Sequence, residues 1–297
     1  MRWLGWLALT VCLCAQVQGA EKLRIVTTFL PGFNVAKNVA GDLATVENLV
    51  PGNVSLHDYQ LSPGELRKLN GADLVLLNGL GLETFLDRAM KSGGAGLKAK
   101  LVVMTDGLHR ELIHGEATHR REEAGHDHAH DPHVWLDPTL MAHAVTNAMR
   151  ALQKADPANA DTYAKNAAAY AAKLRALDAE LKEKLAAVKE VPVITYHNAF
   201  GYFIRRYGLK LAGVVERVPE IPPSTRERAE LQRMIREKKV KALFSAPGGN
   251  SPLAKSIARD TGIRVGELDP LEMGTLSAES YEEGMRRNVE ALLKGLN

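Results

Sequence analysis

The chain has 297 residues, of which 45% are hydrophobic, and a formal charge of +3 spread over mixed acidic and basic side chains. This balance gives no reason to expect nucleic acid or an anionic lipid surface as a partner. Beyond residue 20, no stretch reaches the ~18 to 20 apolar residues that a membrane-spanning helix needs. The length is enough for two domains of ordinary size or one large one.

Residues 1–20 have the layout of a cleaved signal peptide: a basic residue, an apolar run from Trp3 to Leu13 and two small residues at the end. Both cysteines, Cys12 and Cys14, lie inside this segment. Neither cysteine follows a small residue, so we expect no lipid anchor. The sequence predicts a secreted mature protein without disulfides, whose fold depends on core packing alone.

Short β-rich runs alternate with helical segments along the whole chain. The predicted strands are Leu23–Thr28, Thr45–Val50, Leu74–Asn78 and Leu101–Met104 in the first half, and Val193–Tyr196, Lys210–Val215, Ala242–Ser245 and Arg264–Leu268 in the second. Such alternation is typical of parallel sheets covered by helices. Three helix starts carry a serine followed three positions later by glutamate, at Ser62/Glu65, Ser224/Glu227 and Ser280/Glu283.

We therefore expect an α/β protein with two lobes, each a mostly parallel sheet flanked by helices and joined by one long rigid helix. The predicted parts are a signal peptide (1–20), an N-terminal lobe (21–155) with a His-rich loop (109–131), a linking helix (156–189) and a C-terminal lobe (190–297).

The linking helix begins at Asp156-Pro157, and its ~32 residues would span about 48 Å at 1.5 Å per residue. Its apolar residues form one stripe at helical spacing: Tyr163, Tyr170, Leu174, Leu177, Leu181, Leu185 and Val188. The stripe allows a coiled-coil oligomer, but it is short for one. We favour a monomer in which this helix is a spine behind both lobes, which predicts small lobe movements on ligand binding.

Seven of the ten histidines fall between His109 and His133. Neutral imidazole is a good ligand for zinc and its neighbours in the late first row, so this density predicts metal contact. Fixing side chains in a polar loop costs conformational entropy, so we expect only weak, exchangeable capture there. The histidines assigned to this secondary role are His114, His119, His126, His128 and His130.

Four other side chains stand next to ordered elements and are predicted to form the tight site. His57 lies between a strand and a capped helix, His133 lies between two prolines beside a tryptophan, and His197 directly follows a strand. Asp269 comes just past the last strand. In open α/β sheets ligands bind at the carboxyl ends of strands. Three imidazoles and one carboxylate, two from each half, suit a zinc ion held between the lobes.

Each candidate also has a plainer interpretation. His57 could be a surface loop histidine, His197 a helix cap, and Asp269 only a turn former ahead of a proline. For His143, on a predicted helix, and His109, in the loop, we favour a surface role or support of a ligand from outside the coordination sphere.

Five motifs in order along the mature chain carry a family resemblance. They are Thr27-Thr28-Phe29-Leu30-Pro31, His57 ahead of Leu61-Ser62-Pro63-Gly64-Glu65-Leu66, Asp131-Pro132-His133-Val134-Trp135-Leu136-Asp137-Pro138, Tyr196-His197-Asn198-Ala199-Phe200 with Tyr207-Gly208-Leu209, and Leu268-Asp269-Pro270-Leu271. With them the chain resembles the zinc- and manganese-specific solute-binding proteins of bacterial ABC importers.

The resemblance implies a periplasmic high-affinity receptor, not an enzyme, that delivers its ion to a cognate ABC permease in the inner membrane. It implies metal ligands at His57, His133, His197 and Asp269. Zinc-type members are similar to this chain in having histidine at the third ligand position and a His-rich loop, whereas manganese-type members tend to have a carboxylate there. The expected cargo is therefore Zn²⁺, with Mn²⁺ as the alternative.

Two rival functions are a zinc hydrolase and an extracellular metal-buffering adhesin. A hydrolase needs an open coordination position and a general base, and the chain has no His-Glu-x-x-His motif. Nothing in the sequence singles out Glu220, Glu267 or Asp137 as a base. One stretch, Ser245–Asn250, departs from the family pattern, in which relatives often have an acidic residue and glutamine near the site, so the groups around the ligands are predicted to differ here.

Overall fold

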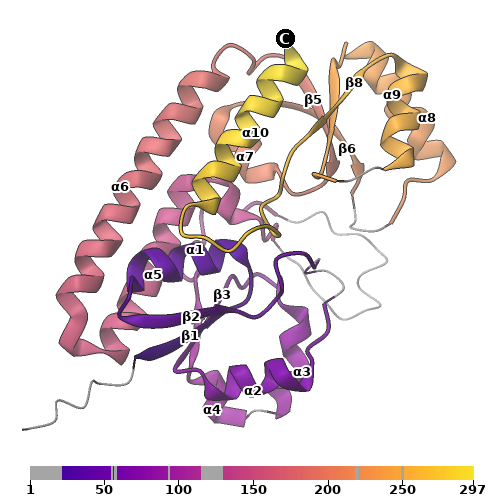
Figure 1. Cartoon of the computed structure of the whole chain (residues 1–297). Coiled ribbons are helices and arrows are strands. Elements are labelled where there is room, and N and C mark those ends of the chain that lie inside the picture. The colour runs from indigo at the N-terminus through magenta and orange to yellow at the C-terminus, as the bar shows by residue number, and fades with distance from the viewer. Residues whose placement is uncertain are drawn as a thin grey trace, which may run out of the picture.

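The computed structural model describes residues 22–54, 56, 59–92, 94–114, 130–217, 221–248 and 251–297. It has two lobes, each built on a parallel sheet with helices on its faces, and a long helix that runs beside both (Figure 1). The α/β fold predicted from the sequence is thus confirmed.

The sheet of the N-terminal lobe has four parallel strands in the order β2-β1-β3-β4. The strands are β1 (Leu23–Thr27), β2 (Ala44–Asn48), β3 (Leu74–Leu77) and β4 (Leu101–Val103). Every residue of the central strand β3 is buried, as expected for a parallel strand with helices on both faces.

The sheet of the C-terminal lobe repeats this arrangement, with four parallel strands in the order β6-β5-β7-β8. The strands are β5 (Pro192–His197), β6 (Lys210–Glu216), β7 (Ala242–Ser245) and β8 (Arg264–Glu267). In both sheets the strand order reverses beside the first strand of the lobe, and ligands of open α/β sheets bind at such a switch point.

The structure has helices at the three serine-marked starts and over most of the predicted linking segment, together with others that the sequence analysis did not place. They are α1 (Leu30–Ala40), α2 (Pro63–Gly71), α3 (Asp87–Ser92), α4 (Gly94–Lys98), α5 (Pro138–Ala155), α6 (Ala160–Leu185), α7 (Gly201–Tyr207), α8 (Thr225–Glu237), α9 (Pro252–Thr261) and α10 (Ser280–Leu296), with 3-10 turns η1 (Thr84–Leu86), η3 (Val134–Leu136) and η4 (Pro157–Asn159). Among the described residues, no helix is both long and apolar enough to cross a membrane.

Two of the three predicted capping boxes are present. Ser62 and Ser224 each cap a helix, and the carboxylate of the glutamate three residues later accepts a hydrogen bond from the backbone N–H of the capping serine. The third prediction is wrong, because Ser280 is the first residue inside α10 and Glu279 precedes it as the cap. The Ser280 hydroxyl instead donates to the Ser277 carbonyl at 3.0 Å. The serine spacing alone could not distinguish a cap from a first-turn residue with a tertiary partner.

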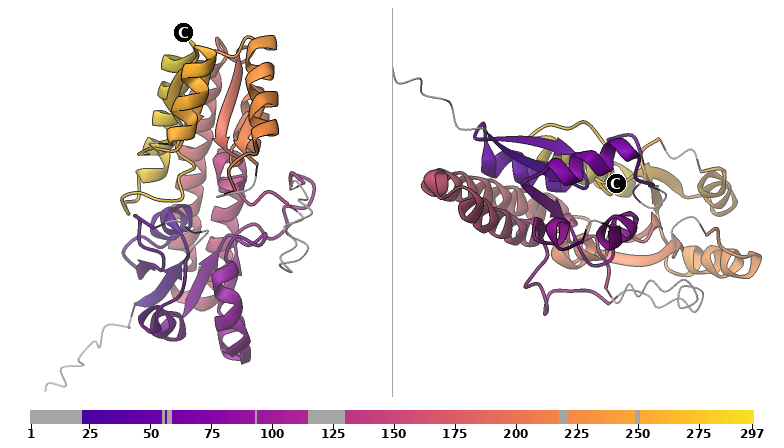
Figure 2. Two further views of the ribbon diagram at one scale, coloured as in Figure 1. Left: turned by 90° about the vertical axis from the view of Figure 1, so that its right-hand side faces the viewer. Right: turned by 90° about the horizontal axis from the view of Figure 1, so that it is seen from below.

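The long helix α6 runs alongside the stacked lobes (Figures 1 and 2). Its apolar stripe is buried within the chain's own core, with at most 2% exposure at any of the seven predicted positions. The helix packs on α5, α1 and α10, and one core cluster contains residues of both lobes from Ile25 to Leu296. Because the stripe packs inside this chain, it is not available for a coiled coil with another chain. The position of α6 thus agrees with the predicted long helix behind both lobes.

Candidate metal centre

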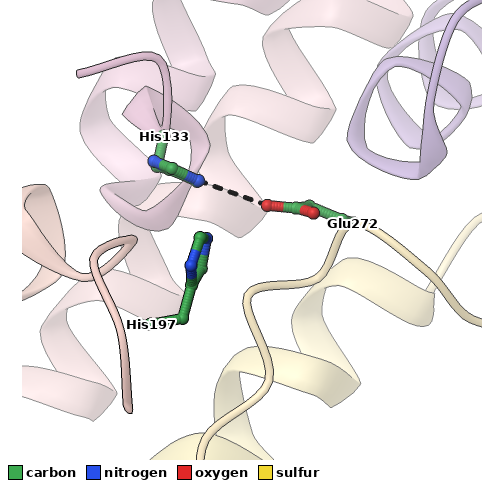
Figure 3. A group of neighbouring side chains, drawn as sticks. All are labelled: His133, His197 and Glu272. Atoms are coloured by element: carbon green, nitrogen blue, oxygen red, sulfur yellow. Dashed lines mark ion pairs between the residues drawn. The ribbon is translucent and has the colours of Figure 1, made fainter. Parts of the chain in front are cut away.

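Three potential metal ligands from three separate segments converge where the lobes meet. The side chains of His133, His197 and Glu272 point toward one another, and one ligand atom of each lies within 4.8 Å of the other two (Figure 3). His133 and Glu272 are buried, and His197 is partly buried. The structure thus brings together two of the four predicted ligands and adds a carboxylate that the sequence analysis did not select.

His197 is placed by the sheet of the C-terminal lobe. It is the last residue of β5, which lies between β6 and β7. Its ring centroid lies 5.4 Å from that of His133, with an angle of 81° between the ring planes. The predicted location at a strand end is therefore correct, and the strand-switch position explains why the side chain emerges toward the other lobe.

His133 is placed by a short connecting strap, residues 130–137, between β4 and α5. The Asp131 carboxylate accepts from the backbone N–H of His133 at 2.9 Å and lies 2.6 Å from its Nδ1. Because a ring N–H donated to a carboxylate fixes the imidazole tautomer and orientation, Nε2 is left to face the other ligands. Asp131 thus determines which nitrogen of His133 is offered to a metal.

Both lobes hold the strap in place. The Tyr202 hydroxyl of α7 donates to the Asp131 carbonyl at 2.9 Å, and the Asn78 amide at the end of β3 donates to the Pro132 carbonyl at 3.0 Å. Gly201 lets the strap approach closely, because a Cβ there would lie 2.9 Å from Asp131 Oδ2. The backbone on both sides of His133 is therefore fixed from outside the strap.

Glu272 is the potential ligand that the sequence analysis did not select. Its Oε1 lies 3.2 Å from His133 Nε2. The preceding residue, Leu271, has a left-handed backbone (φ 60°), and its N–H donates to Asp269 Oδ1 at 2.8 Å. This Asp-Pro turn carries the chain past Asp269 and directs the third residue after it into the site. The available signal was a glutamate at the end of Asp269-Pro270-Leu271-Glu272.

Asp269 acts as the turn former that its plainer interpretation suggested. Its side chain accepts the Leu271 N–H, and it does not belong to the group of converging ligand atoms formed by the described residues. Burial raises the pKa of its carboxyl, although the Leu271 N–H and the charge of Arg287 act in the opposite direction. A direct bond from Asp269 to the metal stays a prediction.

The other predicted histidines fall into two groups. His57, His119, His126 and His128 lie outside the described residues. His114 and His130 form an antiparallel bridge, with ring centroids 5.2 Å apart, which closes the base of the His-rich segment.

Two histidines were assigned surface or supporting roles. His109 is exposed, whereas His143 is half-buried. Nε2 of His143 lies 2.6 Å from the Asp106 carbonyl. His143 therefore supports the connection after β4.

One separation between donor atoms matches the spacing of ligands around a small tetrahedral ion. Ligand atoms at ~2.0 to 2.1 Å from a tetrahedral zinc are about 3.3 to 3.4 Å apart. The 3.2 Å between His133 Nε2 and Glu272 Oε1 is close to this value. Two imidazoles and a carboxylate are also a donor set that zinc accepts. Because manganese prefers oxygen donors, the carboxylate would allow manganese to bind as well.

The electrostatics favour a cation between the same groups. Burial by itself lowers the pKa of His133, but hydrogen bonds and the charges of Asp131 and Glu272 raise it to about 9. In the metal-free protein the imidazole is therefore protonated at neutral pH and held between two carboxylates. To bind there, a divalent metal would have to displace the proton from Nε2, and its charge would replace that of the imidazolium between the two carboxylates.

The stretch that departs from the family pattern lies at the end of β7. Ser245 is buried, pairs with Glu267 of β8, and accepts the Leu268 N–H at 2.8 Å. Gly249 and Asn250 lie outside the described residues. Ser245 therefore stabilises the strand that leads to the Asp269 turn, and the predicted effect on the groups around the ligands stays a prediction.

Two parallel sheets, a helical spine and a buried donor set for a divalent ion at the junction of the lobes together define a metal-binding solute-binding protein. The family model "Zinc-uptake complex component A periplasmic" matches residues 25–295, and the chain belongs to this family.

Several curated relatives and solved structures are similar over nearly the whole chain. The zinc-binding lipoprotein AdcA of Streptococcus pneumoniae is 33% identical over 294 residues, covering 96% of this chain but 58% of that protein. The chain thus spans little more than half the length of the AdcA relatives that it matches. The high-affinity zinc uptake system protein ZnuA of Bacillus subtilis is 34% identical over 286 residues, covering 93% of this chain and 88% of the relative.

Among solved structures, a crystal structure of ZnuA has a TM-score of 0.79 at 27% identity and covers 93% of this chain and 100% of that chain. The solute-binding protein FpvC of Pseudomonas aeruginosa in complex with Mn²⁺ has a TM-score of 0.80 at 29% identity, covering 93% of this chain and 98% of that chain. These similarities agree with the fold and with the resemblance seen in the sequence.

Proposed function

We propose that this protein is a periplasmic high-affinity receptor that binds one zinc ion between its lobes and delivers it to an ABC-type importer in the inner membrane. The observation that carries the proposal is the convergence of His133, His197 and Glu272 at the junction of the lobes. The protein captures and releases the ion without covalent chemistry, as expected of a transport receptor and not of an enzyme.

The proposed coordination sphere consists of His57, His133 and His197 with an acidic ligand. Glu272 is supported by its distance to His133, whereas Asp269 is supported by the family resemblance. Three imidazoles and one carboxylate complete the four positions that zinc favours.

Two observations favour zinc as the cargo. The third proposed ligand position has a histidine, His197, and the relatives AdcA and ZnuA are named as zinc-binding and zinc-uptake proteins. Manganese is the second candidate, because Glu272 supplies an oxygen donor and FpvC has been solved with Mn²⁺ and with Ni²⁺. The relative affinities of manganese and zinc, measured by competition for the metal-free protein, distinguish the two.

We assign the His-rich segment a secondary role, weak capture of ions by His114, His119, His126, His128 and His130. The bridge between His114 and His130, which brings two of these imidazoles together, supports this role. Deleting residues 115–130 should leave one tight site and remove most of the weaker binding. A metal buffer would instead lose nearly all its capacity.

For cellular context, we propose a cleaved signal peptide over residues 1–20, periplasmic location and a monomer that docks on its cognate permease. The division into lobes at 21–155 and 190–297 with a linking segment at 156–189 belongs to the same proposal.

Zinc-dependent melting tests the proposal. Binding to the folded state alone should raise its stability by RT ln(1 + [L]/Kd), which is about 2.7 kcal/mol at a hundredfold excess over Kd. We expect zinc to raise the melting temperature of the chelated protein and His197→Ala to remove most of that rise. A melting curve that zinc does not move would contradict the proposed function.

A further inference from the structure

One buried side chain links the backbone beside His133 to the backbone beside Glu272. Trp135 lies two residues after His133 in η3, and its side chain is 1% exposed. Its indole Nε1–H donates to the carbonyl of Pro270 at 2.7 Å. Pro270 lies two residues before Glu272. The hydrogen bond therefore joins the two lobes, and each of its two residues is two positions from a proposed ligand.

We propose that Trp135 is a positioning residue for the metal site, which holds His133 and Glu272 at bonding separation through its hydrogen bond to Pro270. This inference rests on the proposed function. Trp135 is the second residue after His133, and Pro270 is the second residue before Glu272, so the hydrogen bond connects the backbones of the two ligands by a short path. It is closed by the 3.2 Å approach of His133 Nε2 to Glu272 Oε1.

The indole is fixed on its own side of this path. The Trp135 carbonyl accepts from the hydroxyl of Tyr281 in α10 at 2.7 Å, which gives the same residue a second link between the lobes. The ring lies edge-on to Phe29, with centroids 4.9 Å apart, and 5.1 Å from the ring of His133. Trp135 therefore cannot turn away without disturbing the neighbouring ligand.

The acceptor is fixed as well. The side-chain amide of Asn288 in α10 donates to the Asp269 carbonyl and accepts from the Asp269 N–H, both at 2.7 Å. The N–H of Leu271 donates to Asp269 Oδ1 at 2.8 Å. Hydrogen bonds on both sides of Pro270 thus fix the position of its carbonyl. A shift of Trp135 relative to Pro270 would therefore change the distance between His133 and Glu272.

Further along, the segment after Glu272 has its own link to the N-terminal lobe. The Asn38 amide of α1 donates to the Ala278 carbonyl at 2.8 Å. Loss of the Trp135 bond should therefore loosen the site without separating the lobes. Its effect is expected in metal binding more than in folding.

The test is Trp135→Phe, which keeps an aromatic ring and removes the indole N–H. We expect the zinc Kd, measured by chelator competition on residues 21–297, to rise about tenfold, at the lower end of the effect of removing a group that orients a metal ligand. The zinc dissociation rate should rise with it. The melting temperature of the metal-free protein should fall by less than that of the zinc-loaded protein.

Tyr163→Phe is the matched control. Its hydroxyl is in α6, away from the site, and donates to Asp156 Oδ2 at 2.7 Å, and the residue is fully buried. This variant also loses a hydrogen bond of a buried aromatic residue, but zinc Kd should stay at the wild-type value. Tyr281→Phe breaks the second link of Trp135 while keeping the indole, and should also weaken zinc binding.

The outcomes separate the two proposals. If the wild-type protein binds zinc tightly and both Trp135→Phe and Tyr281→Phe bind it equally well, the positioning role is wrong while the receptor function stands. If the wild-type protein does not bind zinc, the proposed function itself fails. Trp135 is the sole tryptophan of residues 21–297. The fluorescence emission maximum of the Tyr281→Phe variant therefore reports whether the Trp135 indole stays buried. This check keeps the test decisive if Trp135→Phe does not fold.

Discussion

The two lobes have the same sheet order but position their proposed histidine ligands in different ways. His197 is the last residue of a central strand, so the hydrogen bonds of the sheet fix its backbone. His133 lies in a connecting strap and depends on Asp131, Asn78 and Tyr202 for its position. A ligand at a strand end is positioned by the fold itself, whereas a ligand in a strap is positioned by specific side chains around it.

Loss of either histidine should have the largest effect. His133→Ala or His197→Ala removes a direct bond to the metal, and we expect zinc Kd to rise more than about 100-fold, beyond the range seen for supporting groups. Isothermal titration against a competing chelator measures the change. Near wild-type affinity in either variant would show that the metal is held elsewhere.

The acidic ligand is tested by an isosteric pair, Glu272→Gln and Asp269→Asn. If Glu272 binds the metal, its amide variant should lose about 100-fold in zinc affinity, because a neutral amide is a poor zinc ligand compared with a carboxylate. Asp269→Asn keeps an oxygen that can accept the Leu271 N–H and should bind zinc more tightly than Glu272→Gln. The reverse order would identify Asp269 as the ligand.

The difference between the lobes also explains what the sequence could predict. All eight strands and the buried stripe of α6 follow from short-range patterns of apolar residues, and the structure places them within two residues of the expected positions. The position of His197 at a strand end follows in the same way, because a strand end is a local feature of the sequence. His133 was selected for its stiff setting and for the histidines around it, and the structure brings it close to His197.

Glu272 was missed because its selection depends on backbone geometry that no local pattern specifies. The left-handed conformation of Leu271 directs Glu272, and not Asp269, toward His133. The capping role expected of Ser280 failed for a related reason, since its hydroxyl accepts from the Asn34 amide of α1 at 2.8 Å. Long-range contacts decide between neighbouring candidates, and a single sequence does not contain them.

Asp131→Asn tests how much the strap ligand depends on its support. The variant keeps the side-chain shape but removes the carboxylate beside His133 Nδ1, so the tautomer is no longer fixed. We expect zinc Kd to rise between about 10-fold and 100-fold. The measurement belongs at pH 9 or above, where competition from the His133 proton contributes little. An unchanged Kd would mean that the strap orients His133 without Asp131.

The pH dependence should have opposite signs with and without metal. The pKa of His133 is raised from 6.5 to about 9 in the folded protein. The resulting stabilisation of the metal-free fold is complete below pH 6.5 and is lost as pH rises through 9. Zinc affinity should instead strengthen by about tenfold per pH unit over this window, because one proton leaves Nε2. Chelator competition and melting curves at several pH values measure the two trends.

Parallel trends would contradict the assignment of His133 as the titrating ligand. A similar slope in His133→Ala would lead to the same conclusion, because that variant has no imidazole to titrate at this position.

The smallest expected effects are those of the two helix caps. Ser62→Ala in the N-terminal lobe and Ser224→Ala in the C-terminal lobe each remove a side chain that accepts a first-turn N–H. Each should lower stability by about 1 kcal/mol and leave zinc Kd unchanged. Chemical denaturation checks the first expectation and metal titration the second. A cap variant that weakens zinc binding would show that the site depends on these helix starts.

The most direct test of the account is a crystal structure of the zinc-loaded protein with anomalous diffraction at the zinc edge. We predict one strong peak between the lobes, about 2.0 to 2.2 Å from His133 Nε2, from a ring nitrogen of His197 and from a Glu272 carboxylate oxygen. A strongest peak among the histidines of the His-rich segment, with no peak between His133 and Glu272, would contradict it.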